Sequence, residues 1–174
     1  MNKTFIMMIM LLLPISTEAK TVFVGDSISY GMAKYSNNIN SGIVGSGLTV
    51  GNPHKNYKHW EKYSKNNKVV VEIGTNDYSY KGYEYGKLLS QYILPLSNID
   101  NICIVSVPNP LHRNIIQKGI SNINPQIKEW TKNNNIKYIT FPEYYPNEKI
   151  KDGIHFKPKS YKRLAIEIIK KCSE

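Results

Sequence analysis

One short segment constrains the fold of this chain more than any other. Residues 68–73 read Lys-Val-Val-Val-Glu-Ile, an almost continuous β-branched run that ends at Gly74-Thr75-Asn76-Asp77. A run of this kind is typical of a central strand that is buried on both faces, as in a parallel sheet. Parallel neighbours need crossover connections, so helices are expected between this strand and the others.

The rest of the chain shows that alternation. Further strands are expected at residues 21–24, 39–44, 101–107 and 136–141. Helices are expected at 30–37, 60–66, 83–96, 113–132 and 158–171, with Pro95 ending or kinking the third and Pro125 interrupting the fourth. This order predicts one α/β domain over residues 20–174, a three-layer α/β/α sandwich around a mostly parallel, five-stranded, flavodoxin-like sheet.

The N-terminus has the layout of a secretory signal peptide. Lys3 precedes an apolar stretch from Phe5 to Leu13, and small residues stand at Thr17 and Ala19. We therefore expect cleavage after Ala19 and a periplasmic or secreted protein with no stable membrane span. An uncleaved anchor is the alternative.

The chain contains two cysteines, Cys103 and Cys172. Export to an oxidising compartment would allow them to pair. Cys103, however, lies in the apolar run at 102–105, where a cysteine serves as a small buried hydrophobic residue. We therefore expect two free thiols.

The formal net charge is +10, and removal of residues 1–19 leaves it unchanged because Lys3 and Glu18 cancel. The lysines are scattered, and the sequence has no zinc finger or other nucleic-acid-binding signature, so we expect no nucleic-acid partner. An anionic envelope component, either polysaccharide or lipid, would suit a basic exported protein. The alternative is that the positive charge reflects a lysine-rich composition and implies no partner. We expect the protein to be a monomer.

Polar segments follow the first three expected strands: Asp26-Ser27, the glycine-rich residues 42–47, and Asn76-Asp77. Taken alone, Asp26-Ser27 is typical of a helix cap. Ligand sites in parallel sheets, however, lie beyond the carboxyl ends of the strands, so the fold should bring the three segments together.

A fourth segment, Asp152-Gly153-Ile154-His155, stands before the last expected helix. Acyl transfer needs a hydroxyl nucleophile, an imidazole base and a carboxylate that fixes the imidazole tautomer. Asp152 is close enough in sequence to reach the imidazole of His155, which would then face Ser27. The other histidines (His54, His59 and His112) have no comparable neighbours, and we expect them on the surface or in loops.

These four segments, in this order, resemble the four conserved blocks of the SGNH (GDSL-type) hydrolase superfamily, in particular a small exported bacterial-type member. The resemblance extends over essentially all of residues 20–174. It implies a serine hydrolase that acts on carboxylic esters through an acyl-enzyme, with neither a metal nor an organic cofactor. It also implies that Ser27 is the nucleophile, His155 the general base and acid, and Asp152 the residue that orients His155.

The same resemblance implies an oxyanion hole formed by the N–H of Ser27, the side-chain amide of Asn76 and the N–H of a glycine in the second block. Both Gly45 and Gly47 fit that position. Asp26 is expected to support the turn before Ser27. Asp77 is expected to brace the loop that carries Asn76.

The substrate is an ester, expected to be a short acyl or acetyl group on carbohydrate, or a lipid ester. Tyr78 and Tyr80 follow Asn76 and could form a wall for a sugar ring or acyl chain, or they could be ordinary loop tyrosines. Two other functions remain open from the sequence. One is an O-acyltransferase that uses the same triad on envelope polysaccharide, and the other is a catalytically silent carbohydrate-binding module.

Overall fold

The computed structural model describes residues 20–174, which form a five-stranded parallel sheet with the strand order β2-β1-β3-β4-β5. The expected signal peptide at residues 1–19 lies outside the described residues. The strands are β1 (Thr21–Gly25), β2 (Ile39–Gly42), β3 (Lys68–Glu72), β4 (Ile102–Val105) and β5 (Lys137–Ile139). The register pairs Gly25 of β1 with both Gly42 of β2 and Glu72 of β3, so these three strands end level with one another.

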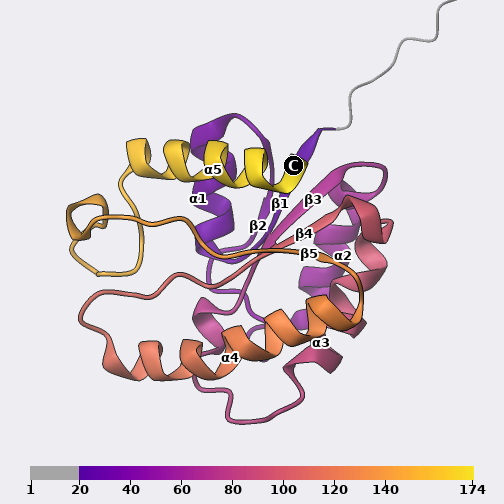
Figure 1. Cartoon of the computed structure of the whole chain (residues 1–174), viewed down its shortest axis with the longest axis horizontal. Helices are drawn as coiled ribbons and strands as arrows, with labels where there is room; N and C mark the ends of the chain where they lie inside the picture. The colour runs from indigo at the N-terminus through magenta and orange to yellow at the C-terminus, as the bar shows by residue number, and fades with distance from the viewer. Residues whose placement is uncertain (1–19) are drawn as a thin grey trace, which may run out of the picture.

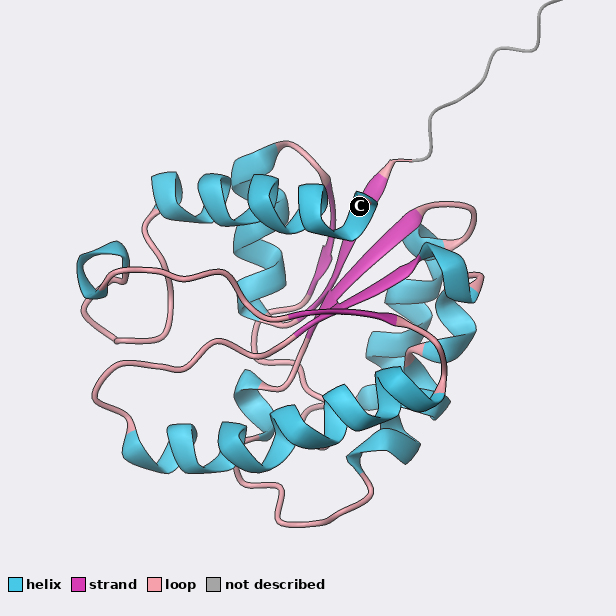
Figure 2. Ribbon diagram, viewed as in Figure 1, coloured by secondary structure: helices cyan, strands magenta, loops and turns pink. Residues whose placement is uncertain are grey.

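Helices cover both faces of the sheet (Figures 1 and 2). They are α1 (Ser27–Ser36), α2 (Pro53–Ser64), α3 (Tyr85–Tyr92), α4 (Asn114–Asn133) and α5 (Pro158–Ser173), with short 3-10 helices at Thr75–Asp77, Leu94–Leu96, Ile99–Asn101 and Pro146–Glu148. Helices α1 and α5 pack together on one face, and α2, α3 and α4 cover the other. The predicted α/β/α sandwich is therefore confirmed. Among residues 20–174, no helix combines the length and the apolar character that a membrane crossing needs.

Alternate strand residues enter two separate cores, which explains why the strands are apolar throughout. Val22, Val69 and Val71 belong to the core beneath α2, α3 and α4. Phe23 and Val70 belong to the core beneath α1 and α5. Since successive side chains of a strand point to opposite faces, a strand covered on both sides cannot alternate with polar residues.

Helix α1 begins three residues earlier than predicted and α3 is shorter than predicted, while larger differences concern α2 and α4. Helix α2 begins at Pro53 rather than at residue 60, because the Asn52 side chain accepts a hydrogen bond from the N–H of Lys55 at 3.0 Å and proline suits the first helical turn. Helix α4 continues through Pro125, so the predicted interruption is wrong. The isoleucines on both sides of this proline, Ile123 and Ile127, are buried against the sheet, and their packing offsets the loss of one helical hydrogen bond.

The prediction of two free thiols is also wrong, because Cys103 and Cys172 form a disulfide. Helix α5 runs back along the sheet to the end where the strands begin (Figure 1), and its last residues there lie close to Ile102 and Cys103 of β4. The two Cα atoms are then 5.9 Å apart, within the range that a disulfide requires. The disulfide lies near the amino ends of the strands, whereas Ser27 lies at their carboxyl ends.

Candidate active site

Ser27 is the first residue of α1 and follows directly from the end of β1. The preceding Asp26 caps the helix: its carboxylate accepts a hydrogen bond from the N–H of Ile28 at 2.9 Å. Gly25 has a φ of +142°, and a Cβ atom there would lie 1.7 Å from the carbonyl oxygen of Glu72. Only glycine can therefore pass β3 this closely, and the turn sets the Ser27 hydroxyl at the N-terminus of α1, where the helix dipole favours developing negative charge.

The structure brings Ser27, His155 and Asp152 together in one chain of contacts. His155 Nε2 lies 2.8 Å from Ser27 Oγ, and His155 Nδ1 lies 2.6 Å from Asp152 Oδ2. A proton on Nδ1 donated to Asp152 leaves Nε2 free to accept the proton of the Ser27 hydroxyl. This geometry lets His155 act as a general base toward Ser27.

Asp152 is held in its ionised form. Its other oxygen, Oδ1, accepts hydrogen bonds from the N–H groups of Ile154 and His155 at 2.8 and 2.9 Å. Partial burial raises the pKa of Asp152, but the hydrogen bonds from the His155 side chain and from these two N–H groups outweigh it and lower the pKa below its usual value.

Lys149 positions the loop that carries Asp152 and His155, a role that the sequence did not predict. The residue is 5% exposed, and its ammonium group donates a hydrogen bond to the carbonyl of Ile154 at 2.9 Å. The same ammonium lies over the rings of Phe156 and Tyr144, at 4.2 and 4.7 Å from their centroids. Burial lowers the pKa of Lys149 to about 8, although the nearby carboxylates of Asp152 and Glu72 oppose this shift. A lysine in a charged loop normally lies in solvent, so nothing local in the sequence signals this burial.

The second loop is tied to the turn before Ser27 and to Asn76. Ser46 donates its hydroxyl hydrogen to the carbonyl of Gly25 at 3.0 Å, and the Asn76 side-chain amide donates to the carbonyl of Ser46 at 2.8 Å. Gly45 and Gly47 flank Ser46. Within residues 20–174, neither of their N–H groups donates a hydrogen bond to the protein. Gly45 is exposed with a φ of +76°, whereas Gly47 is buried.

Asp77 is buried and accepts four hydrogen bonds. These come from the N–H groups of Leu48 and Thr49, both at 2.8 Å, the Thr49 hydroxyl at 2.6 Å and the Tyr85 hydroxyl at 2.7 Å. A Cβ atom on Gly47 would lie 2.3 Å from the same carboxylate. Asp77 therefore fastens the second loop to the loop that carries Asn76, and no oxygen of it is left free for proton transfer.

Two further carboxyl groups lie buried beneath the site. Asp26 accepts a second hydrogen bond, from the N–H of Thr75 at 3.1 Å, which connects the turn before Ser27 to the residue before Asn76. Burial raises the pKa of Asp26 to about 6. Burial, together with the neighbouring Asp26, also raises the pKa of Glu72 well above its ordinary value. The nearby ammonium group of Lys149 opposes this rise in the pKa of Glu72.

The two tyrosines expected to bind substrate have different surroundings. Tyr78 lines a surface groove together with His112, Arg113 and Ile115. Tyr80 instead packs on Tyr85, with ring centroids 5.5 Å apart, and its hydroxyl accepts a hydrogen bond from a backbone N–H. Both tyrosines also line a neighbouring hollow beside α4, but the ring of Tyr78 is the more exposed of the two.

Several solved structures share this fold at low sequence identity. No protein-family model matches the chain, and no curated protein matches it. A lipase/acylhydrolase from Enterococcus faecalis superposes with a TM-score of 0.67 at 18% identity, covering 89% of this chain and 96% of that one. A GDSL-like lipase from Bacteroides thetaiotaomicron gives 0.66 at 19% identity, covering 92% and 90%. A catalytic mutant of an acetylxylan esterase from Geobacillus stearothermophilus gives 0.62 at 15% identity, covering 93% and 97%.

The chain thus has the fold of the SGNH (GDSL-type) hydrolases over nearly its whole described length. Its strand order, 2-1-3-4-5, changes direction between β1 and β3. Ligands bind at such switch points in open parallel sheets, and Ser27 and Asn76 follow these two strands.

Proposed function

We propose that this protein is a carboxylic ester hydrolase that works through an acyl-enzyme on Ser27. The observation that carries the proposal is the continuous contact from Ser27 Oγ through the imidazole of His155 to the carboxylate of Asp152, at 2.8 and 2.6 Å. Two of the structures that share the fold are catalytic mutants of the acetylxylan esterase, one with a serine and one with a histidine replaced by alanine.

In the first half-reaction, Ser27 Oγ attacks the ester carbonyl while its proton passes to His155 Nε2. The tetrahedral oxyanion would receive hydrogen bonds from the N–H of Ser27, from the Asn76 amide and from the N–H of Gly45 or Gly47. An amide nitrogen carries two hydrogens, so Asn76 can hold the Ser46 carbonyl with one and offer the other. His155 then returns the proton to the departing alcohol, which leaves an acyl group on Ser27.

In the second half-reaction, His155 takes a proton from water, the hydroxide attacks the acyl carbonyl, and Ser27 regains its proton as the acid leaves. Asp152 stays ionised throughout and stabilises the imidazolium form of His155. Asp26 and Asp77 hold the loops that carry the oxyanion donors.

The substrate class that we propose is a short acyl group, such as acetyl, on a carbohydrate. The described residues form one domain, with no inserted domain that could cover a long acyl chain. One of the structures that share the fold is named as an acetylxylan esterase, although others are named as lipases.

We also propose that the protein is exported. The sequence of residues 1–19 supports this proposal. The disulfide between Cys103 and Cys172 supports it too, because such bonds persist outside reducing compartments.

Turnover of 4-nitrophenyl acetate and labelling by a fluorophosphonate probe would test the activity in the full-length protein. Ser27→Ala should abolish labelling and lower kcat by about 10⁴-fold or more. Ser121→Ala is a matched control, because Ser121 is exposed and its hydroxyl bonds only to a carbonyl of its own helix. A Ser27→Ala enzyme as active as the wild type would refute the proposal.

An acyl-chain series from acetate to palmitate esters would then test the substrate class, and we expect the highest kcat/KM for acetate. Product analysis with a sugar acceptor would separate hydrolysis from acyl transfer. Free acetate as the sole product supports a hydrolase.

A further inference from the structure

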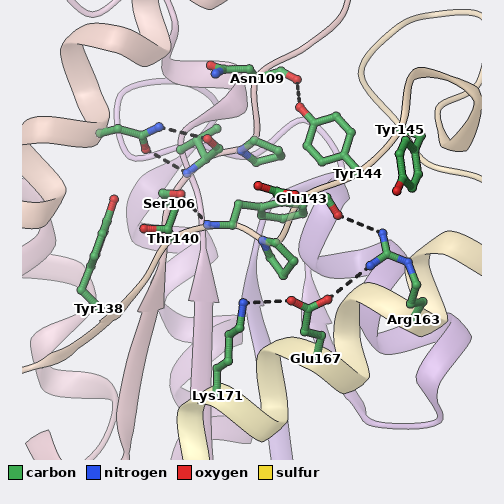
Figure 3. Close-up of a pocket in the computed structure, with 15 residues that line it drawn as sticks. Ser106, Asn109, Tyr138, Thr140, Glu143, Tyr144, Tyr145, Arg163, Glu167 and Lys171 are labelled. Carbon is green, nitrogen blue, oxygen red and sulfur yellow. Dashed lines mark hydrogen bonds and ion pairs between the residues drawn. The ribbon is translucent and has the colours of Figure 1, made fainter.

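A pocket separate from the candidate active site lies at the carboxyl ends of β4 and β5. It is bounded by the loop after β4, by residues 140–145 after β5, and by one face of α5 (Figure 3). Its volume is about 910 Å³, within the size range of ligand-binding clefts. None of the residues expected from the sequence to act in catalysis or substrate binding lines this β4–β5 pocket.

The charges in the β4–β5 pocket compensate one another. Arg163 forms ion pairs with Glu148 and Glu167, and Lys171 forms one with Glu167. The charged residues that line the pocket are two basic and two acidic side chains: Arg163, Lys171, Glu143 and Glu167. Neither an anion nor a cation would find an excess of opposite charge here, although the whole chain is strongly basic.

The exposed lining is aromatic and hydroxyl-bearing rather than aliphatic. Tyr138 stands on one side of the pocket and Tyr144 and Tyr145 on the other (Figure 3). Tyr145 is 75% exposed and Tyr138 is half-buried. Thr140, which carries a hydroxyl group, is also exposed. By contrast, the apolar lining residues Val107 and Phe141 are buried, so the pocket offers no open aliphatic surface to an acyl chain.

We propose that the β4–β5 pocket binds sugar residues of a neutral glycan, beyond the residue that carries the ester. A sugar ring presents apolar C–H faces that can pack on tyrosine rings, and hydroxyl groups that pair with phenol, hydroxyl and carboxylate groups. The substrate part of this proposal rests on the proposed function, whereas glycan binding itself does not.

Two contacts connect the pocket to the loop that carries Asp152 and His155. Tyr144 lines the pocket, and its ring packs edge-on against Phe156, the residue after His155, at 5.0 Å between centroids. The loop that contributes Asn109 to the pocket continues to Leu111, whose N–H donates to the carbonyl of Gly153, next to Asp152, at 2.7 Å. A polymer in the pocket would therefore run alongside the loop that holds Asp152 and His155.

Calorimetric titration of the Ser27→Ala protein with neutral xylo-oligosaccharides and cello-oligosaccharides would test binding without turnover. We expect binding of a neutral oligosaccharide that salt does not weaken. Tyr145→Ala or Tyr138→Ala in the same background should weaken it by about five- to tenfold. Tyr83→Ala should leave the affinity unchanged, because Tyr83 is 88% exposed and lies outside the pocket.

The proposal is overturned if no neutral oligosaccharide binds, if only an anionic oligogalacturonate binds, or if Tyr145→Ala binds as tightly as its parent. In the wild-type background, Tyr145→Ala should lower the ratio of kcat/KM for acetylated xylo-oligosaccharide to that for 4-nitrophenyl acetate by about fivefold. If the wild type hydrolyses neither ester, the proposed function fails, while the titration still decides whether the pocket binds glycan.

Discussion

The four hydrogen bonds to Asp77 predict a large loss of stability when its carboxylate is changed. In Asp77→Asn, one of the two oxygens becomes an NH₂ group, which must then face either the two donors of Thr49 or the donors of Leu48 and Tyr85. Each hydrogen bond to a charged group contributes about 1.5–3 kcal/mol, so the loss of two should cost roughly 3–6 kcal/mol.

Tyr85→Phe is a milder change at the same carboxylate. It removes one buried donor at 2.7 Å and leaves the bond from Leu48 to the same oxygen in place. The expected cost is about 1.5–3 kcal/mol, or a fall in Tm of roughly 3–12 °C for a domain of this size. Tyr83→Phe is a matched control, because an exposed tyrosine should change stability by less than about 0.5 kcal/mol.

Urea unfolding of the single variants and the double variant would measure these costs, with an expected coupling of about 1 kcal/mol or more between Asp77 and Tyr85. The interpretation of Asp77 as a brace predicts that Asp77→Asn loses activity together with stability. An Asp77→Asn protein that is as stable as the wild type but inactive would refute the reasoning, because it would assign Asp77 a part in the chemistry.

Three further outcomes are expected. Asn76→Ala should lower kcat for 4-nitrophenyl acetate by about 10²- to 10³-fold with the fold intact by circular dichroism, and unchanged kcat would exclude Asn76 as an oxyanion donor. Because burial raises the pKa of Asp26 to about 6, its stabilising contribution is present at pH 4 and is lost as the pH rises through 6. The wild type should therefore gain stability relative to Asp26→Asn on going from pH 7 to pH 4 in urea unfolding, and the opposite trend would contradict the shift. Cys103 and Cys172 are 69 residues apart, so reduction of their disulfide should lower the free energy of unfolding by about 4 kcal/mol. Urea unfolding with and without reductant would measure this loss.

The sequence by itself determined the fold class and the segments that meet at the site. A parallel strand that is buried on both faces is apolar throughout, so the apolar runs at residues 68–73 and 102–105 predict central strands. The pairing of the candidate base with its carboxylate is also local in the sequence. Asp152 and His155 are three residues apart, and their contact at 2.6 Å needs only one tight loop.

Only the tertiary structure decided the contacts between distant segments. Three of the four hydrogen bonds to Asp77 come from Leu48 and Thr49, which lie 29 and 28 residues before it. The burial of Lys149, whose ammonium group lies over the rings of Tyr144 and Phe156, is likewise not visible in the local sequence. The disulfide was mispredicted for the same reason, since Cys103 is paired by the path of α5 across the sheet. Helix α4 passes through Pro125 because packing of the flanking isoleucines outweighs a local preference. Local patterns record which residues are buried, whereas the pairing of buried polar groups depends on how the elements pack.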